Sequence, residues 1–294
     1  MNRLGYELIR DAVDLHVHSG PSHFPRRLDD DELVAALEEA GLRAAVLKAH
    51  EGSTAERAYL AQKRASRLRI FGSITLNRFV GGLNPYAVES ALALGAKIVW
   101  FPTVHAENHL RFYGGAGYRE MPRHPQLRLP VEGITVLGED GRLVEAAQNI
   151  LELCAERRAV VATGHLHPSE TRVLVKEARA RGVEHVLVTH PHLPVTRIPL
   201  ELQKELASLG AWLEHSYLPT TEKWGGFPLE TLLYDVKEVG PERCVLQSDL
   251  GQVSLPSPAD GLAALCEGLV RNGLSETDVR RMIADNPARI LGLD

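Results

Sequence analysis

The chain alternates eight times between a short apolar run and a segment with helical periodicity, and this repeat restricts the folds open to it. The eight candidate strands are Ala12–Val17, Ala44–Ala49, Ile70–Leu76, Lys97–Phe101, Ala159–Thr163, Val186–Thr189, Ala211–Glu214 and Cys244–Gln247. Each run is almost continuously apolar, which is typical of strands in a parallel sheet that helices cover on the outside. Eight strand–helix units predict an α/β fold of the (β/α)8 TIM-barrel type. An open doubly wound sheet is the alternative, but no glycine-rich phosphate loop follows the first strand.

The length is consistent with this prediction. A barrel typically takes ~250 residues, so the 294 residues predict a single domain, 1–294, with room for long loops. The two longest connections follow strand four (103–142) and strand seven (215–228). Loops that follow barrel strands lie at the mouth that holds active sites, and long loops in a compact domain are often functional. We expect the loop after strand four to cover the mouth and to contribute to substrate choice.

Composition excludes several kinds of partner. The formal net charge is −5, which disfavours non-specific nucleic-acid binding, and no apolar stretch is long enough to span a bilayer. The polar start lacks the apolar segment of a secretory signal. Three widely spaced cysteines fit a reducing compartment rather than a disulfide framework. We therefore expect a cytoplasmic protein that acts on a small molecule without nucleic-acid or membrane partners, and that is able to form homo-oligomers.

Histidines gather where the candidate strands end. Of the thirteen histidines, nine lie at or just beyond a strand's C-terminal end: His16, His18, His50, His105, His165, His167, His190, His192 and His215. In a barrel all nine belong to one mouth, the usual place of the active site. The other four, His23, His109, His124 and His185, are expected at the surface or in loops.

One subset of these residues predicts a metal site. His16 and His18 are two residues apart on strand one, so both side chains point to the same face. His165, His190 and Asp249 end strands five, six and eight. Imidazole and carboxylate ligands without cysteine suit Zn²⁺ first, and then Mn²⁺, Fe²⁺ or Co²⁺. We predict that these five side chains converge on a metal ion that activates a water molecule, with Asp249 as the catalytic acid and base.

In these five positions the sequence resembles the amidohydrolase superfamily of metal-dependent barrel hydrolases. That superfamily carries HxH on strand one, His on strands five and six and Asp on strand eight, and the ending Asp285-Asn-Pro-Ala-Arg resembles its closing helix. The resemblance implies hydrolysis of an amide, lactone or ester bond, or deamination of a ring. It does not select a substrate.

The sequence departs from the superfamily pattern at strand four. Binuclear members carry a bridging carboxylated Lys or a Glu there, whereas Lys97 is at the wrong end and the strand's exit has no carboxylate. Lys48, near the exit of strand two, is the alternative: it is expected to be catalytic, to bridge two metals as a carbamate, or to bind an anionic substrate. One ion or two therefore both remain open.

Further residues are candidates for lining the mouth. They are His50, His105, His167, His192, Glu214 and His215, with Arg26, Arg111, Tyr113 and Arg119 as weaker candidates for substrate binding. Arginine in such loops suits a carboxylate or phosphate.

Two other functions stay open. Asp14-Leu-His-Val-His-Ser also resembles the opening of the polymerase-and-histidinol-phosphatase family of phosphoesterases, but Lys48-Ala stands where Thr-Asp is expected, and Asp249 is not followed by the DxH histidine. The other alternative is a catalytically silent barrel that binds a metal or a small ligand.

Overall fold

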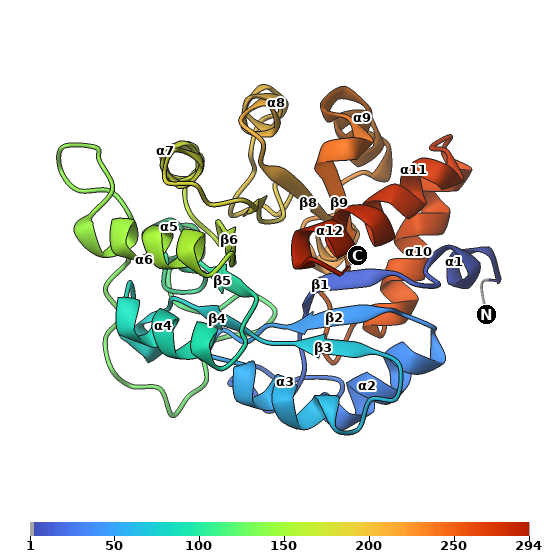
Figure 1. The fold of residues 1–294 in the computed structure, drawn as a ribbon, viewed down its shortest axis with the longest axis horizontal. Helices are drawn as coiled ribbons and strands as arrows, with labels where there is room; N and C mark the ends of the chain where they lie inside the picture. Colours follow the sequence, from blue (N-terminus) through green and yellow to red (C-terminus); the bar gives the residue numbers. More distant parts are fainter. Residues whose placement is uncertain (1–2, 294) are drawn as a thin grey trace.

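The computed structural model describes residues 3–293, and its strands and helices alternate as predicted (Figure 1). The strands are β1 Val13–Val17, β2 Ala44–Leu47, β3 Arg69–Phe71, β4 Ser73–Thr75, β5 Ile98–Trp100, β6 Val160–Ala162, β7 Val186–Val188, β8 Trp212–Ser216 and β9 Cys244–Gln247. The α-helices are α1 Arg3–Leu8, α2 Asp30–Glu39, α3 Ala55–Gln62, α4 Pro85–Ala93, α5 Glu107–Tyr113, α6 Glu145–Glu156, α7 Pro168–Ala180, α8 Leu200–Ser208, α9 Leu229–Val239, α10 Pro258–Arg271, α11 Glu276–Arg280 and α12 Asn286–Leu291.

All neighbouring strands are parallel, in the orders β1-β2-β3 and β4-β5-β6-β7-β8-β9. The predicted third strand, Ile70–Leu76, is broken in two at Gly72, so that β3 pairs with β2 and β4 pairs with β5. A Cβ on Gly72 would lie 2.5 Å from the Cα of Ala55, so only glycine lets the bent strand pass this close to the start of α3. The bend explains why one predicted strand appears as two.

The first and last strands meet just beyond their ends. Val17 forms a parallel bridge with Leu250. The Asp249 amide donates to the His16 carbonyl (3.0 Å), and the His18 amide donates to the Leu250 carbonyl (2.8 Å). The join between the first and last strand positions therefore runs through predicted metal ligands.

Two apolar layers hold the barrel together. Inside the ring, Leu15, Val46, Trp100 and other inward side chains pack with Ile290 and Leu293 from the C-terminal end of the chain. A second, larger layer lies between the strands and the surrounding helices. In Figure 1, α12 lies over the centre of the ring of strands, so it closes the end of the barrel opposite the strand exits.

Local signals explain the helix boundaries. Asp29 caps α2 in a capping box with Glu32, and Ser257 caps α10. The last helix was expected to end near Ala284, but it continues through a π-helical turn, Arg281–Asp285, directly into α12. The wider turn accommodates one extra residue where the chain bends beneath the barrel.

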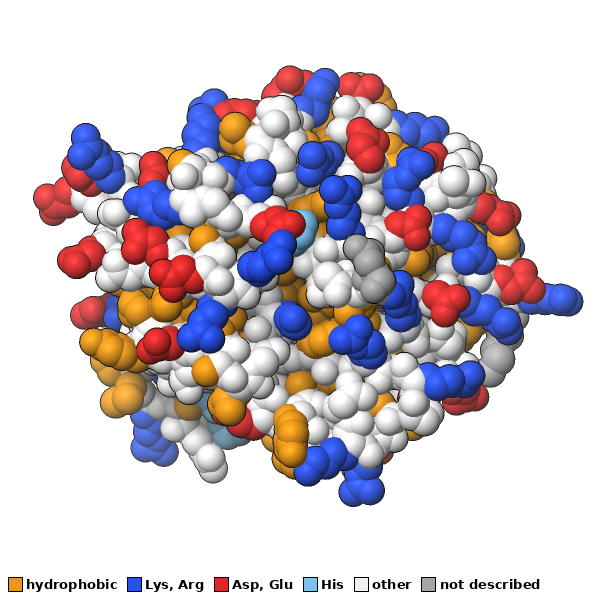
Figure 2. Space-filling view, viewed as in Figure 1, with side chains coloured by type: hydrophobic (Ala, Val, Ile, Leu, Met, Phe, Trp, Pro, Cys, Tyr) orange, Lys and Arg blue, Asp and Glu red, His pale blue; other side chains and the backbone are white. Residues whose placement is uncertain are grey.

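The surface carries mixed charge. On the face seen in Figure 2, basic and acidic side chains are interspersed rather than gathered by sign. None of the helices between residues 3 and 293 has the length and apolar character that a membrane crossing needs.

Candidate metal centre

Three buried side chains at the join between β1 and β9 form the centre of the site. His16, His18 and Asp249 each offer a ligand atom, and these atoms lie within 4.8 Å of one another. The Oδ1 atom of Asp249 is 2.9 Å from His16 Nε2 and 3.3 Å from His18 Nε2. The three residues are 0%, 2% and 3% exposed in this order for His16, His18 and Asp249.

Hydrogen bonds to the far side of each imidazole determine which nitrogen faces the centre. Glu214 of β8 lies with Oε1 2.7 Å from His16 Nδ1, and because a carboxylate only accepts, Nδ1 carries the proton. His18 Nδ1 lies 3.0 Å from the Lys48 carbonyl oxygen and donates to it for the same reason. Both Nε2 atoms therefore present lone pairs toward Asp249. Three electron-rich atoms that face one point need a cation between them, and metal-binding histidines are usually oriented in this way.

Lys48 extends from the exit of β2 into the same centre. Its Nζ donates to His16 Nε2 at 2.8 Å and lies 4.2 Å from the centre of the Trp100 ring. Burial lowers the pKa of Lys48 to about 8, although the charges of Asp249 and Glu214 oppose the shift. The ammonium is therefore still mostly charged at neutral pH.

His165 and His190 stand next to this group. Their ring centres are 5.1 Å apart, and that of His190 is 5.8 Å from that of His16. Burial lowers the pKa of His190 to about 4, so its imidazole is neutral at pH 7, and its Nδ1 is buried without a hydrogen-bond partner. The structure thus brings all five predicted ligands to one place, as a set of three with a neighbouring pair.

Backbone strain coincides with the ligands. His190 (φ +25°) and Asp249 (φ +52°) both lie in the left-handed region at the ends of β7 and β9. Residues other than glycine seldom adopt such angles, and they do so mainly where the surrounding structure fixes a functional side chain. Gly164 (φ +62°) makes a similar turn before His165, where a Cβ would overlap the Phe101 carbonyl.

A histidine that the sequence reasoning placed in a loop also belongs to the site. His109 of α5 is fully buried and stacks on His165, with ring centres 4.9 Å apart. Its Nδ1 is 2.8 Å from His165 Nδ1, and its Nε2 donates to the Gly117 carbonyl (3.0 Å). His109 does not follow a strand, so strand ends gave no signal for it; the only available signal was its position in the long loop after strand four.

His50 also lines the site, as expected. Its ring centre is 5.1 Å from that of His18, and its Nδ1 lies 2.9 Å from Thr103 Oγ1. Its Nε2 is 3.4 Å from the Tyr118 hydroxyl.

The structure places several other candidates away from the centre. His215 alternates with the inward Glu214 on β8, so it points outward and contacts Cys244 Sγ at 3.2 Å. His192 pairs with Asp235 at 2.9 Å among the outer helices. His167 is exposed and caps α7, because the chain has already entered that helix.

Two candidates from the loop after strand four also lie apart. His105 accepts from the Arg78 amide (2.9 Å), and its ring stacks near Phe79. The Arg111 side chain is 79% exposed and pairs with Glu107 at 2.8 Å. Neither contacts the metal ligands.

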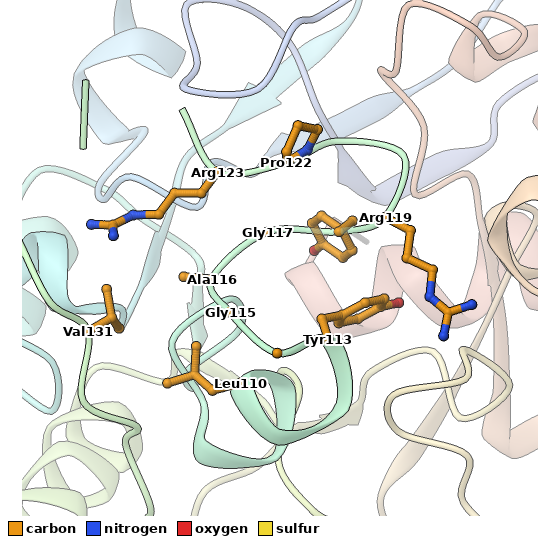
Figure 3. A pocket seen from close by; sticks show the side chains of 11 residues that line it. Leu110, Tyr113, Gly115, Ala116, Gly117, Arg119, Pro122, Arg123 and Val131 are labelled. Carbon is orange, nitrogen blue, oxygen red and sulfur yellow. The ribbon is translucent and has the colours of Figure 1, made fainter. Parts of the chain in front are cut away.

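Tyr113 and Arg119 line a separate pocket of 510 Å³ in the same loop. Figure 3 shows both side chains on one side of this pocket and Arg123 on the other. Of the two, Tyr113 is nearer the site, because its ring centre is 4.7 Å from that of His109.

An apolar cap covers the centre. It combines residues from the loops after several strands, namely Phe24, Val104, Tyr118, Met121, Leu193, Val195, Leu218, Trp224, Leu250 and Leu255. Tyr118 and Met121 come from the long loop after strand four, and Trp224 comes from the loop after strand seven. Both long loops therefore lie over the mouth, and they separate the buried ligands from solvent.

Comparison with known proteins identifies a family and a fold. A model described as "Family of unknown function (DUF6282)" matches residues 11–214. Among curated proteins, none matches this chain in sequence.

Solved structures resemble the whole chain. An amidohydrolase from Pseudomonas aeruginosa has a TM-score of 0.63 at 15% identity and covers 98% of both chains. The probable dipeptidase PvdM from the same organism has a TM-score of 0.62 at 13% identity, over 99% of this chain and 96% of the other. A putative 2-pyrone-4,6-dicarboxylic acid hydrolase from Pseudomonas putida has a TM-score of 0.58 at 16% identity, over 97% and 98%. The predicted barrel fold is confirmed.

Proposed function

We propose that this chain, which belongs to the DUF6282 family of unknown function, is a metal-dependent hydrolase of the amidohydrolase type that acts on a small molecule. One observation carries the proposal: the Nε2 lone pairs of His16 and His18 and the carboxylate of Asp249 face one buried point. Similar barrels include proteins named as a dipeptidase and a dicarboxylic acid hydrolase. These names support hydrolysis of an amide or lactone bond.

The residues present fit a divalent transition metal. Two imidazoles and one carboxylate are the donors that Zn²⁺ prefers in catalytic sites, and Mn²⁺, Fe²⁺ and Co²⁺ accept the same set. The unpartnered Nδ1 of His190 shows that the neighbouring pair also has unused donor capacity. We propose that His16, His18 and Asp249 hold one ion and that His165 and His190 complete its surroundings or hold a second.

A divalent ion bound there lowers the pKa of a water molecule enough for it to act as the nucleophile near neutral pH. Asp249 then has two tasks: its carboxylate accepts the proton of that water and returns it to the leaving amine or alcohol. The Lys48 ammonium is placed to donate to the oxygen on which negative charge develops. Glu214 keeps His16 in the required tautomer, and the apolar cap excludes other water.

Metal analysis and turnover test this function together. Purified protein is expected to carry about one or two equivalents of zinc or another divalent metal and to hydrolyse members of a panel of dipeptides, N-acyl amino acids and lactones. His16→Ala should lose metal and activity together, whereas His124→Ala, outside the ligand set, should keep both. Turnover of phosphomonoesters alone would favour the phosphoesterase alternative, and metal binding without any turnover would favour a silent barrel.

Location is a separate part of the proposal. Cys154, Cys244 and Cys266 are all buried free thiols, which supports a reducing compartment, the cytoplasm.

A further inference from the structure

Arg26 is attached to the same loop that carries Asp249. Its backbone forms an antiparallel bridge with Gln252, and the next amide, that of Arg27, donates to the Gly251 carbonyl at 2.8 Å. The guanidinium therefore has a fixed origin three residues from a predicted metal ligand.

The side chain reaches the edge of the metal centre. Its Nη2 lies 3.2 Å from His18 Nδ1, on the opposite side of the imidazole from Asp249. Its Nε donates to Ser22 Oγ at 3.4 Å, and its guanidinium carbon is 5.9 Å from the Phe24 ring centre. About one imidazole ring thus separates the guanidinium from the point where the ligands converge.

This guanidinium has no counter-charge. Within residues 3–293, no carboxylate oxygen lies within ion-pair distance of it, and its Nη1 is buried without a hydrogen-bond partner. Burial lowers the pKa of Arg26 to about 10, so it is charged at neutral pH. A buried charge without a partner is costly, and an anionic ligand would supply that partner.

Glu51 is the nearby acid that competes for this role. Its Oε1 already accepts from Ser22 Oγ (2.7 Å) and from the His23 amide (2.6 Å). These two bonds hold the carboxylate away from Arg26.

A cavity of 530 Å³ lies beside Arg26. Its lining includes Pro25, Gln252 and Trp224. Gln252 Oε1 and Trp224 Nε1 are themselves buried without partners. A small polar ligand in this region would therefore meet unused donors and an acceptor next to the guanidinium.

We propose that Arg26 binds a carboxylate of the substrate, so that the enzyme hydrolyses small organic acids in which a short spacer separates the carboxylate from the scissile bond. This inference rests on the proposed function. A carboxylate fits better than a phosphate, because it is planar, pairs with the guanidinium through two hydrogen bonds, and brings only one negative charge close to Asp249 and Glu51.

Matched inhibitors separate the carboxylate from the metal. The monohydroxamates of malonic, succinic and glutaric acid are compared with the corresponding compounds whose carboxylate is a primary amide. The hydroxamate chelates metal in both series, so the ratio of their dissociation constants reports the carboxylate subsite alone. At one spacer length the acid should bind the metal-loaded wild type at least about 10-fold more tightly than the amide.

Variants assign this preference to Arg26. Arg26→Gln should abolish it, Arg26→Lys should retain part of it, and Arg172→Gln, which removes an arginine on the outside of α7, should leave it unchanged. Equal binding of acid and amide by the wild type, or a preference that survives in Arg26→Gln, would overturn the inference while leaving the hydrolase function intact. If Arg26→Gln does not fold, Arg26→Lys decides by the same ratio.

Two further results are informative. If neither hydroxamate binds, the metal proposal fails, and benzoate then decides: binding to wild type that Arg26→Gln loses supports the anion site, and equal binding or none overturns it. Inorganic phosphate that binds more tightly than benzoate would overturn the choice of a carboxylate. Glu51→Gln should keep the preference; its loss there would show that Arg26 serves Glu51 instead.

Discussion

The Nδ1 atoms of His109 and His165 lie 2.8 Å apart within stacked rings, so one of them must donate a proton to the other. His109 Nε2 donates to the Gly117 carbonyl, which leaves His109 Nδ1 as the acceptor. His165 Nδ1 is then the donor, and the lone pair of His165 is on Nε2. A residue of the loop after strand four thus selects the tautomer of a predicted ligand on β6.

This relationship predicts that His109 acts as a positioning residue. His109→Phe keeps a ring but removes the acceptor, and it should weaken metal binding by about 10- to 100-fold. His109→Asn restores an acceptor oxygen and should recover part of the affinity. Competition against a chelator with a metal-sensitive absorbance measures this without turnover. Equal affinities for His109→Phe and wild type would contradict the role.

The ligands on straight strand exits were within reach of the sequence. His16 and His18 follow the two-residue alternation of β1, and His165, His190 and Asp249 each end an apolar run. The same rule could place Glu214 and His215, since adjacent strand residues face opposite sides and only one of them enters the barrel. The structure puts Glu214 inside.

The alternation rule stops where the chain leaves the strand. His190 has φ +25°, so the chain turns there and carries His192 outward to Asp235. His109 and Arg26 depend on how long loops fold back over the mouth, which is decided by packing between residues far apart in the sequence. No local pattern records such contacts.

A surface carboxylate provides a test of stability that does not involve the metal. Glu38 accepts from the amides of Ser66, Arg67 and Leu68, and these bonds lower its pKa to about 2. Because the folded pKa lies below the ordinary value, its contribution is complete above about pH 4.5 and is lost as the pH falls toward 2.

We therefore expect Glu38→Gln to lower the free energy of unfolding by about 1 kcal/mol at pH 7, after allowance for solvent screening. Its Tm should fall by ~2 °C. The difference from wild type should shrink at pH 3, where the native carboxylate has lost part of its advantage. Glu39→Gln, the exposed neighbour, serves as the control in thermal melts at both pH values. A difference between Glu38→Gln and wild type that grows on acidification would refute this account.

The apolar cap should control access to the site. The Tyr118 ring lies edge-on to Trp224, with ring centres 4.9 Å apart, and its hydroxyl is 3.4 Å from His50 Nε2. Tyr118→Ala removes this contact between the two long loops and should raise KM by about 10-fold, equivalent to ~1.4 kcal/mol of lost contact, with the metal content unchanged. Tyr118→Phe keeps the ring and should stay within about two-fold of wild type in KM. Steady-state kinetics with parallel metal analysis distinguishes these cases, and an unchanged KM in Tyr118→Ala would show that the cap does not limit substrate binding.

The left-handed backbone at Asp249 makes asparagine the most informative substitution there. With φ +52°, most side chains would add strain, whereas asparagine tolerates this region nearly as well as aspartate. Asp249→Asn therefore removes the negative charge and the proton acceptor while it keeps the backbone and one ligand oxygen. We expect kcat to fall by about 10²- to 10⁴-fold, with a smaller loss of metal affinity, as measured by turnover and metal content on the same sample. Asp249→Ala should lose more metal and fold less stably, because it adds strain and has no ligand atom. Near-full turnover by metal-loaded Asp249→Asn would reject the acid and base role of Asp249, and Lys48, whose Nζ lies 2.8 Å from His16 Nε2, would become the group to test next.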